Sequence, residues 1–343
     1  MKALARIILD HWDEFDLGQP APQSLDCLLR TPRFHASSHV LFFVFADGSR
    51  EPILIAKTPR IPDDPAFLDR EVTNLQKLAL LRPASLGSVP AVVAYRDWHG
   101  SKLLLETLVP GRPMSPAVVR ARRAACIDGV MRWVTELHVA SRAFVTGPSG
   151  SVRRHLEAVL DRLAATFPES RQVRDMLDRT HELVEPLATQ VLPRVFEHGD
   201  LSSPNILMDA DGHVGVVDWE LADPTGLPAT DVFFFLTYIA FARVDAVHTG
   251  KHVPAFADAF FGSPAWARPY VLDYAKAIGL SSRSLRPLFL LTWVRYAASL
   301  VARLHNDEDA DRRDGQELLQ WLANNRYFVL WKYALEHWKE LDL

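Results

Sequence analysis

The residues best suited to chemistry lie in the segment 198–220, where polar side chains interrupt two short apolar runs. Asp200 and Asn205 bracket a tight loop, and an apolar run follows Asn205. After a turn at 209–212, rich in Asp and Gly, a second apolar run leads to Asp218. Two such runs joined by a turn predict an antiparallel hairpin, whose two ends lie side by side. We therefore expect Asn205 and Asp218 to be neighbours.

A carboxylate beside a carboxamide supplies oxygen ligands for a cation. Mg²⁺ suits such a pair because it is a hard cation that keeps part of its ligand shell for water and phosphate. Asp200, upstream on the same loop, is left free to accept a proton. The segment therefore predicts a Mg²⁺ site at Asn205 and Asp218, with a proton acceptor close to it in the chain.

The same residues carry a resemblance to a known family. The order His198-Gly199-Asp200, then Asn205, then Asp218-Trp219-Glu220 after a strand resembles the catalytic loop and metal-binding segment of kinases. Because glycine, not arginine, precedes the acid, the chain is similar to the aminoglycoside phosphotransferase and choline kinase family. The resemblance covers about 34–238. It implies an α+β, two-lobed, protein-kinase-like fold, with a small N-terminal β-sheet lobe containing one key helix and a larger, mainly helical C-terminal lobe.

The resemblance also implies roles for the residues of this segment. Asp200 would be the catalytic residue that orients the acceptor hydroxyl and accepts its proton. Asn205 and Asp218 would be the two metal ligands. His198 would brace the loop without binding metal, and Asp231 would support the loop from behind. Asp231 also begins a predicted helix, so helix capping stays open as its role.

Nucleotide binding is implied for the N-terminal part of the chain. Lys57 would hold the α- and β-phosphates, with Glu71 as its partner on the key helix. The stretch 103–111 resembles the hinge between the lobes, where the backbone at Glu106 and Leu108 would hydrogen-bond the purine. The backbone groups would then recognise the purine base, so the sequence does not distinguish ATP from GTP as the phosphoryl donor.

The expected phosphate loop departs from the kinase pattern. Many kinases use a glycine-rich loop that lets backbone amides approach phosphate, whereas residues 33–39 contain no glycine. Ser37 and Ser38 are small, and their hydroxyls would donate hydrogen bonds to phosphate oxygens. We therefore include Ser37 and Ser38 in the expected nucleotide site.

Lys57 and Glu71 stand out even without the resemblance. In a strand, Lys57 shares a face with Ile53 and Ile55 and so continues an apolar row. Glu71 lies within the apolar stripe of a predicted helix. A buried charge is costly unless it is paired. The sequence therefore predicts that these two charges of opposite sign are partners.

The surrounding pattern changes character near residue 110. Before it, strands are predicted at 40–45, 52–57, 91–96 and 102–108, with a helix between Asp64 and Leu78. After it, helices are predicted at 116–143, 151–166, 171–188, 231–244, 284–304 and 315–341. We expect a nucleotide-binding lobe at 1–108 and a catalytic and acceptor-binding lobe at 109–343.

Composition sets limits on other functions. The net charge of −4 argues against a large, uniformly basic surface that would bind nucleic acid or an anionic membrane. Two cysteines exclude a disulfide scaffold and a four-cysteine zinc site. The N-terminus lacks a signal-peptide pattern, and the apolar run 232–242 is too short to span a bilayer. These observations favour a cytoplasmic enzyme whose oligomeric state is open.

The expected activity is Mg²⁺-dependent transfer of the γ-phosphoryl group of ATP or GTP to a hydroxyl of a small molecule. Candidate acceptors are an aminoglycoside-like antibiotic, a sugar or an amino-alcohol metabolite. The short spacing 221–230 leaves no room for an activation segment, which disfavours a protein acceptor.

Three sequence features suggest different acceptors. The arginines in 112–154 fit solvated helix faces or an anionic acceptor, and the acidic residues in 307–311 would suit a polycation. Tryptophans in the late helices fit core packing or stacking on a sugar. Two further alternatives stay open for the activity itself: a non-catalytic kinase-like protein that binds a nucleotide or sugar, and nucleotidyl transfer by the same residues.

Overall fold

The structure is a computed structural model of the chain. It describes residues 2–15, 17–30, 39–61, 63–81, 88–144, 150–167, 170–305, 320–321 and 324–343. Two compact units are present, Met1–Pro113 with Asn205–Pro224, and Met114–Pro204 with Thr225–Leu343. The sequence predicted two consecutive segments that meet at residue 108. In the structure the hairpin after Asn205 belongs to the first unit because its strand β9 pairs with β6, at the end of the N-terminal segment.

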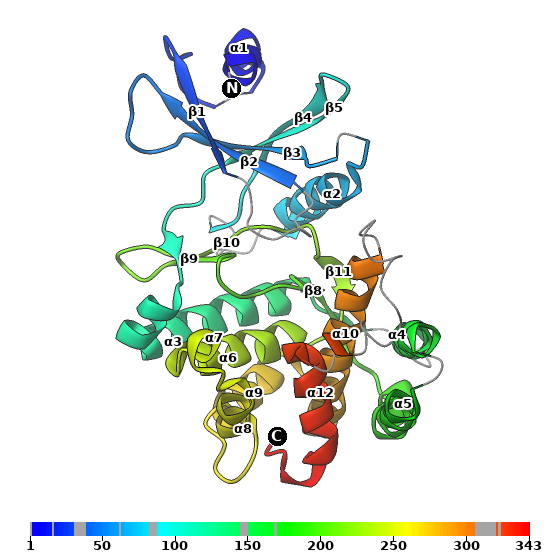
Figure 1. Cartoon of the computed structure of the whole chain (residues 1–343). Helices are drawn as coiled ribbons and strands as arrows, with labels where there is room; N and C mark the ends of the chain where they lie inside the picture. The colour runs from blue at the N-terminus through cyan, green and yellow to red at the C-terminus, as the bar shows by residue number, and fades with distance from the viewer. Residues whose placement is uncertain are drawn as a thin grey trace. The chain divides into compact units, whose positions relative to one another are not determined.

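The first unit is built around an antiparallel five-stranded sheet of order β1-β2-β3-β5-β4 (Figure 1). A smaller sheet of order β10-β9-β6 completes it. Its elements are α1 (Lys2–Asp10), a 3₁₀ turn (Trp12–Glu14), β1 (Leu25–Arg30), β2 (His39–Ala46), β3 (Leu54–Pro59), α2 (Ala66–Leu81), β4 (Val92–Trp98), β5 (Ser101–Thr107), β6 (Arg112–Pro113), β9 (Ile206–Met208) and β10 (Val214–Val216).

The two helices of this unit cover opposite faces of the five-stranded sheet. Leu4 and Ile8 of α1 pack in a cluster that includes Leu103 and Leu105 of β5. Leu68 of α2 packs in another cluster, against Leu104 of the same strand. Successive residues of a strand point to opposite faces, so α1 and α2 lie on different sides of β5. The charged residues of β3, β5 and α2 that share the second face are therefore brought together.

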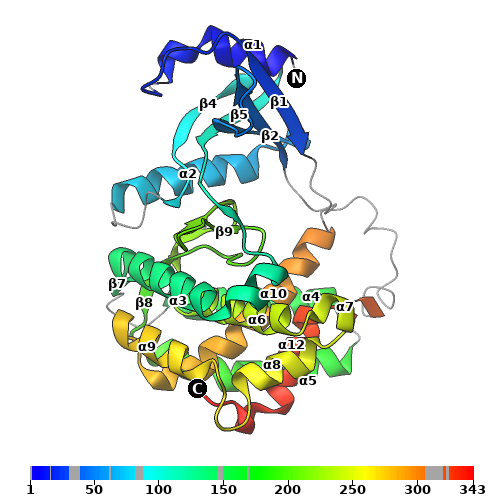
Figure 2. The same ribbon diagram turned by 90° about the vertical axis from the view of Figure 1, so that its left-hand side faces the viewer.

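The second unit is mainly helical. Its elements are α3 (Pro116–Ser141), β7 (Ala143–Phe144), α4 (Gly150–Thr166), α5 (Arg171–Val184), a 3₁₀ turn (Glu185–Thr189), β8 (Pro193–Glu197), α6 (Thr230–Arg243), α7 (Ala246–Thr249), α8 (His252–Phe260), α9 (Arg268–Ile278), a 3₁₀ turn (Ser282–Ser284), α10 (Leu285–His305), α12 (Arg326–Glu336) and a 3₁₀ turn (Trp338–Glu340) (Figure 2). Strand β11 (Asp223–Gly226) joins β8 and β7 in a three-stranded sheet of order β11-β8-β7.

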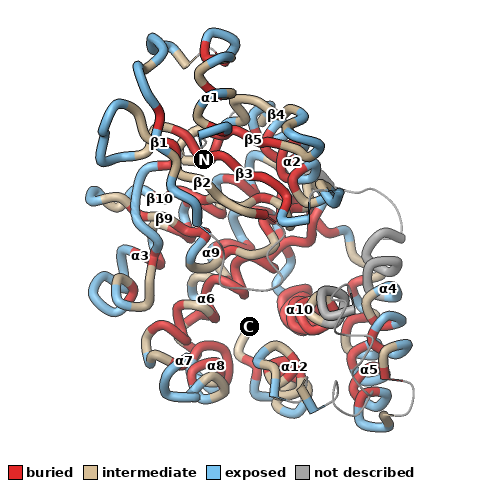
Figure 3. The backbone as a smooth tube through the Cα atoms, turned by 45° about the horizontal axis from the view of Figure 1, so that its top comes forward, coloured by how far each residue is buried: buried red, intermediate tan, exposed pale blue. Residues whose placement is uncertain are grey.

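Helix α6 lies at the centre of the second unit. Most of its side chains are apolar, and nearly all of its residues are buried, as the red segments in Figure 3 show. A helix that is apolar all round is expected in a core. The rings of Phe233, Phe256, Phe289 and Trp293 contact one another there. Trp293 and Trp331 are fully buried, so core packing accounts for these two tryptophans.

The α+β class predicted from the sequence is confirmed, with a sheet-based N-terminal unit and a mainly helical remainder. Within the part of the chain that the structure describes, no helix combines the length and the apolar character needed to cross a bilayer.

Candidate active site

A buried charge cluster lies between β3, α2 and β5. Lys57 Nζ is 2.7 Å from Glu71 Oε1 and 3.0 Å from Glu106 Oε1, and all three residues are almost fully buried. The pair that the sequence predicted is therefore present. Burial alone would lower the pKa of Lys57, but the carboxylates of Glu106 and Glu71 outweigh it and hold that pKa above its usual range. Lys57 therefore stays positively charged and is held in place by two carboxylates.

Glu106 is a second partner of Lys57 that the sequence reasoning did not assign. Its backbone lies within the sheet, because β5 pairs with β3 on one side and with β4 on the other. Its side chain follows that of Leu104 on the face that α2 covers. A single acid directly after the apolar run 103–105 was the signal that could have revealed this contact. The role expected for the backbone at Glu106 and Leu108 in holding a purine stays a prediction.

Glu106 should make the stability of the protein depend on pH. Burial raises its pKa to about 7, although the charge of Lys57 opposes this rise. The pKa of a glutamate in the unfolded chain is about 4.3. Between these values the folded protein keeps a proton that the unfolded chain has lost, so stability falls as pH rises. In Glu106→Gln this fall should shrink by an amount on the order of 2 kcal/mol between about pH 5 and about pH 8.

Denaturant unfolding of the wild type and of Glu106→Gln at both pH values measures this effect. Glu136→Gln, which changes an exposed glutamate of α3, is the matched control and should follow the wild type. An unchanged pH slope in Glu106→Gln would contradict the raised pKa of Glu106.

The expected metal residues lie on the β9–β10 hairpin of the same unit. Val216 pairs with Ile206, and the Val217 N–H donates to the carbonyl oxygen of Asn205 at 3.0 Å. Asn205 is therefore beside the residue that precedes Asp218, as the hairpin pattern predicted. Asp218 has a left-handed backbone with φ of 71°, a conformation rare for residues other than glycine. Such strain occurs most often where function requires a particular side-chain direction.

Hydrogen bonds from α2 hold the segment after Asp218. The Trp219 N–H donates to Glu71 Oε1 at 3.1 Å, the same oxygen that accepts from Lys57. Asn74 Nδ2 donates to the carbonyl oxygens of Trp219 and Ala222, at 2.9 and 3.0 Å. One helix therefore positions both the lysine pair and the segment that bears Asp218.

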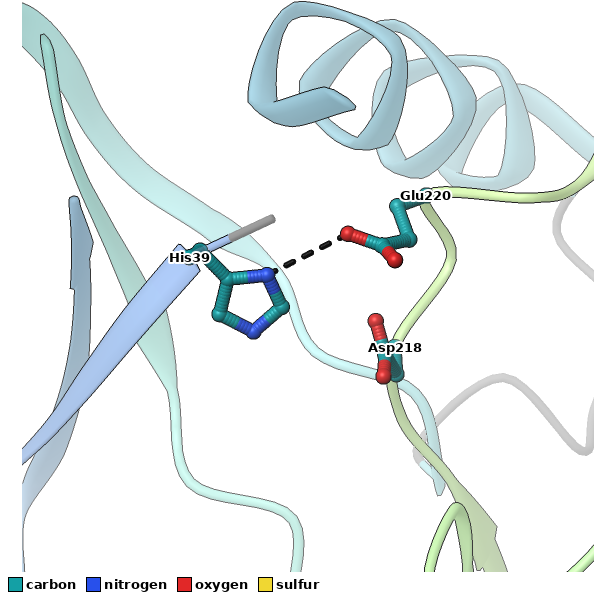
Figure 4. Close-up of side chains that lie close together, drawn as sticks. All are labelled: His39, Asp218 and Glu220. Atoms are coloured by element: carbon teal, nitrogen blue, oxygen red, sulfur yellow. Dashed lines mark hydrogen bonds and ion pairs between the residues drawn. The ribbon is translucent and has the colours of Figure 1, made fainter. Parts of the chain in front are cut away.

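Asp218 lies in an acidic and buried environment. Its carboxylate, that of Glu220 and the ring of His39 each offer a ligand atom, and these atoms all lie within 4.8 Å of one another (Figure 4). His39 Nδ1 is 3.2 Å from Glu220 Oε2. Burial and then the charge of Glu220 raise the pKa of Asp218 to about 7, although Lys57 opposes the shift. Sequence reasoning did not assign His39 or Glu220 to this cluster.

The donor set at Asp218 fits a hard cation. Asp218 Oδ1 is buried and has no hydrogen-bond partner among the described residues. A buried polar oxygen without a partner is costly, and a bound cation would remove that cost. The carboxylates of Asp218 and Glu220 and the amide oxygen of Asn205 are ligands of the type that Mg²⁺ prefers. The residues that would hold Mg²⁺ are therefore present.

The loop that carries Asp200 belongs to the second unit and is held by Asp231. The backbone N–H groups of His198 and Gly199 donate to Asp231 Oδ2 and Oδ1, at 2.7 and 2.9 Å. Gly199 has φ of 85°, which favours glycine at that position. Burial opposes ionisation of Asp231, but its hydrogen bonds and nearby charges, with His138 first among them, lower its pKa overall. The helix cap of α6 is Ala229, so Asp231 braces the loop instead of capping the helix.

Further side chains fix the ends of this loop. Asp200 N–H donates to His198 Nδ1 at 3.2 Å, which makes His198 a bracing residue. Tyr296 of α10 donates its hydroxyl to the Gly199 carbonyl at 2.8 Å. The side chain of Ser202 donates to Asp200 Oδ1 at 3.4 Å. Asp200 is half-buried, on a loop held by these hydrogen bonds.

A buried polar network lies behind Asp231. His138 Nε2 is 3.5 Å from Asp231 Oδ2, and His138 Nδ1 is 2.7 Å from the Tyr274 hydroxyl. The structure therefore places His138 in the core with polar partners. Glu197, directly before the loop, forms an ion pair with Arg295 at 3.1 Å. The sequence reasoning did not find this pair, although Glu197 and Arg295 each lie in a mainly apolar stretch.

Two parts of the expected sites lie outside the described residues. These are Ser37 and Ser38 of the predicted phosphate loop, and the acidic residues in 307–311 that would have suited a polycation.

Comparison with known proteins places the chain among phosphotransferases. The sequence profile of the phosphotransferase enzyme family matches residues 36–272. A homoserine kinase from Methylobacillus flagellatus is 26% identical over 181 residues, which make up 53% of this chain and 54% of that protein. The matched part thus spans about half the length of this curated relative.

Solved structures share the fold. The choline kinase LicA from Streptococcus pneumoniae aligns over 93% of this chain and 99% of its own, with a TM-score of 0.55 and 11% identity. The GDP complex of aminoglycoside 2'-phosphotransferase-IIIa aligns over 95% of this chain and 100% of its own, with a TM-score of 0.54 and 16% identity. At these identities the likeness concerns the kinase-like fold, whereas the sequence profile covers most of the chain and confirms the resemblance noted above. The chain therefore belongs to the phosphotransferase enzyme family.

Proposed function

We propose that the protein is a Mg²⁺-dependent kinase that transfers the γ-phosphoryl group of ATP or GTP to a hydroxyl of a small molecule. The observation that carries this proposal is the position of Glu71. One of its oxygens accepts hydrogen bonds from Lys57 Nζ and from the Trp219 N–H. Glu71 therefore positions both Lys57, the cation expected to bind phosphate, and the segment that bears Asp218, the carboxylate expected to bind Mg²⁺. Phosphoryl transfer requires both groups.

Each residue has a defined part in the proposed reaction. Lys57 binds oxygens of the α- and β-phosphates, and Asn205 and Asp218 hold Mg²⁺, which supplies charge neutralisation on the triphosphate. Asp200 orients the acceptor hydroxyl and accepts its proton as the new bond from the acceptor oxygen to the γ-phosphorus forms. The bond from that phosphorus to the β,γ-bridging oxygen breaks, and the nucleoside diphosphate leaves.

The comparisons support a small alcohol as acceptor. The matched relatives are named as kinases of homoserine and choline and as an aminoglycoside phosphotransferase. The Asp200 loop is braced by buried groups, which suits a rigid residue that positions an acceptor hydroxyl. The short segment between Asp218 and α6 is in keeping with a small acceptor.

Two measurements test the proposal. ATP or GTP should raise the melting temperature of the protein in the presence of Mg²⁺, and this rise should be much smaller in Asp218→Asn. A panel of hydroxylated metabolites should then cause release of ADP or GDP. Release of pyrophosphate would instead identify nucleotidyl transfer. Nucleotide binding with no turnover of any hydroxyl compound would favour a non-catalytic binding protein.

A further inference from the structure

A small pocket lies beside the Asp200 loop in the second unit. Its volume is about 210 Å³, and its lining includes Ser202 and Ser203. Ser202 donates its hydroxyl to Asp200 Oδ1, so a wall of the pocket contacts the candidate catalytic carboxylate directly. Pockets for drug-sized ligands measure roughly 300–1,000 Å³. This pocket therefore suits a compact metabolite better than a molecule with several sugar rings.

The walls combine apolar rings with hydroxyl groups. Phe234, Tyr238 and Phe241 of α6 line the pocket, together with Thr237 of the same helix. Thr237 is 2% exposed, and its hydroxyl has no hydrogen-bond partner in the described part of the chain. A buried hydroxyl without a partner is unfavourable unless a ligand satisfies it. The lining is thus suited to a ligand with a short carbon skeleton and a polar atom.

The charge at the pocket favours an anion. Arg326, at the start of α12, lines it and has no acidic partner among the described residues. The guanidinium lies over the Tyr327 ring at 4.8 Å, and its Nη2 donates to the Tyr327 hydroxyl at 2.8 Å. Most of the five donors of an arginine are therefore still available.

The acidic residue of the pocket is already engaged. Asp245 Oδ1 is 3.8 Å from Arg120 Nη1 and 2.9 Å from His248 Nδ1. An aminoglycoside is a polycation and would need several free carboxylates. The pocket instead offers one carboxylate that is already paired and one available cation, which favours an anionic ligand over a polycation.

We propose that the acceptor is a small hydroxy acid, bound in this pocket with its carboxylate on Arg326 and its hydroxyl directed to Asp200. Its carbon skeleton contacts the rings of α6, and the Thr237 hydroxyl bonds a further polar atom. This inference rests on the proposed kinase activity and narrows its substrate to carboxylate-bearing alcohols. Arginine is well suited to the task because its planar donors match the geometry of a carboxylate.

The test uses terminal alcohols that share a four-carbon chain and differ in charge. The panel consists of 4-hydroxybutanoate, L-homoserine, butane-1,4-diol and 4-aminobutan-1-ol, with kanamycin as the polycation. Release of nucleoside diphosphate by the full-length protein gives kcat/KM for each compound. The two acids should exceed the diol by about tenfold or more, the effect of a hydrogen bond to a charged group, and the amino alcohol and kanamycin should be the poorest. Acids no better than the diol, or a preference for the amino alcohol or kanamycin, would overturn the inference.

Arg326→Gln tests the assigned contact. It should lower kcat/KM for the better acid by about tenfold or more and bring the ratio of acid to diol close to one. Arg283→Gln, which changes an exposed arginine outside the pocket, is the matched control and should keep the preference for acids. A preference that survives Arg326→Gln would contradict the assignment of Arg326. The melting temperatures of both variants establish that they are folded.

Failure of the inference can be separated from failure of the proposed function. Calorimetric titration of the Mg²⁺–ADP or Mg²⁺–GDP complex with each acid measures binding without requiring turnover. Absence of saturable binding for both acids overturns the inference, even where another alcohol is phosphorylated. Absence of any Mg²⁺-dependent nucleotide binding would instead refute the kinase proposal itself.

Discussion

Asp200→Asn should lower kcat for phosphoryl transfer by about 10²- to 10⁴-fold, the usual contribution of a positioned general base. The amide cannot accept the proton of the acceptor hydroxyl, although it has nearly the shape of the carboxylate. Its oxygen can still accept from Ser202, and the backbone contact from residue 200 to His198 is unchanged. The loop should therefore keep its position, and the loss should appear in kcat rather than in folding.

Measurement of nucleotide binding separates chemistry from positioning. Mg²⁺-dependent thermal stabilisation by ATP or GTP should be nearly the same in Asp200→Asn and in the wild type, because the residues expected to hold the triphosphate lie elsewhere in the chain. Asp178→Asn, which changes an exposed aspartate of α5, provides the control and should retain full turnover. Full turnover in Asp200→Asn would eliminate Asp200 as the proton acceptor.

The parts of the site that sequence reasoning found are those governed by local rules. Lys57 and Glu71 each lie on an apolar face of a regular element, and the cost of an isolated buried charge pointed to their pairing. Asn205 and Asp218 lie at the ends of a short hairpin, so the turn alone made them neighbours. In both cases the spacing along one or two elements was sufficient.

The residues that were missed depend on contacts between distant segments. Tyr296 reaches Gly199 from α10, and His39 reaches Glu220 from β2. No periodicity along the chain relates such residues. Glu106 was missed for a different reason, because the resemblance directed attention to its backbone and not to its side chain.

The N-terminal helix shows the same limit in the fold. Residues 2–10 are mostly apolar, but the segment is short, and the sequence reasoning noted only a short apolar stretch followed by acids. In the structure Leu4 and Ile8 are fully buried against the sheet, and tertiary packing stabilises this short helix. The pocket beside the Asp200 loop was likewise invisible, because its lining comes from α3, α6, α7, α12 and the loop itself.

Lys57→Met should have the largest effect on stability. It removes the cation between Glu71 and Glu106 and leaves two buried carboxylates without their shared partner. Loss of one member of a buried ion pair typically costs about 3–5 kcal/mol. Nucleotide binding should also be lost, since no other described residue of this cluster carries a positive charge. Lys77→Met, at an exposed position of α2, should change the free energy of unfolding by less than about 0.5 kcal/mol.

The pH dependence of this variant distinguishes electrostatic destabilisation from loss of packing. Without Lys57 the pKa of Glu106 should rise further, because the main charge that opposes the effect of burial is removed. The folded variant then holds a proton that the unfolded chain releases, so the stability of the variant falls as pH rises. The variant should therefore be more stable at about pH 5 than at about pH 8. Denaturant unfolding at about pH 5 and about pH 8 should therefore show a smaller deficit, relative to the wild type, at the lower pH. Adding Glu106→Gln to Lys57→Met should restore part of the stability at the higher pH, because it removes one of the two uncompensated acids. A deficit that is equal at both pH values, and that Glu106→Gln does not reduce, would mean that Lys57 contributes by packing and not by its charge.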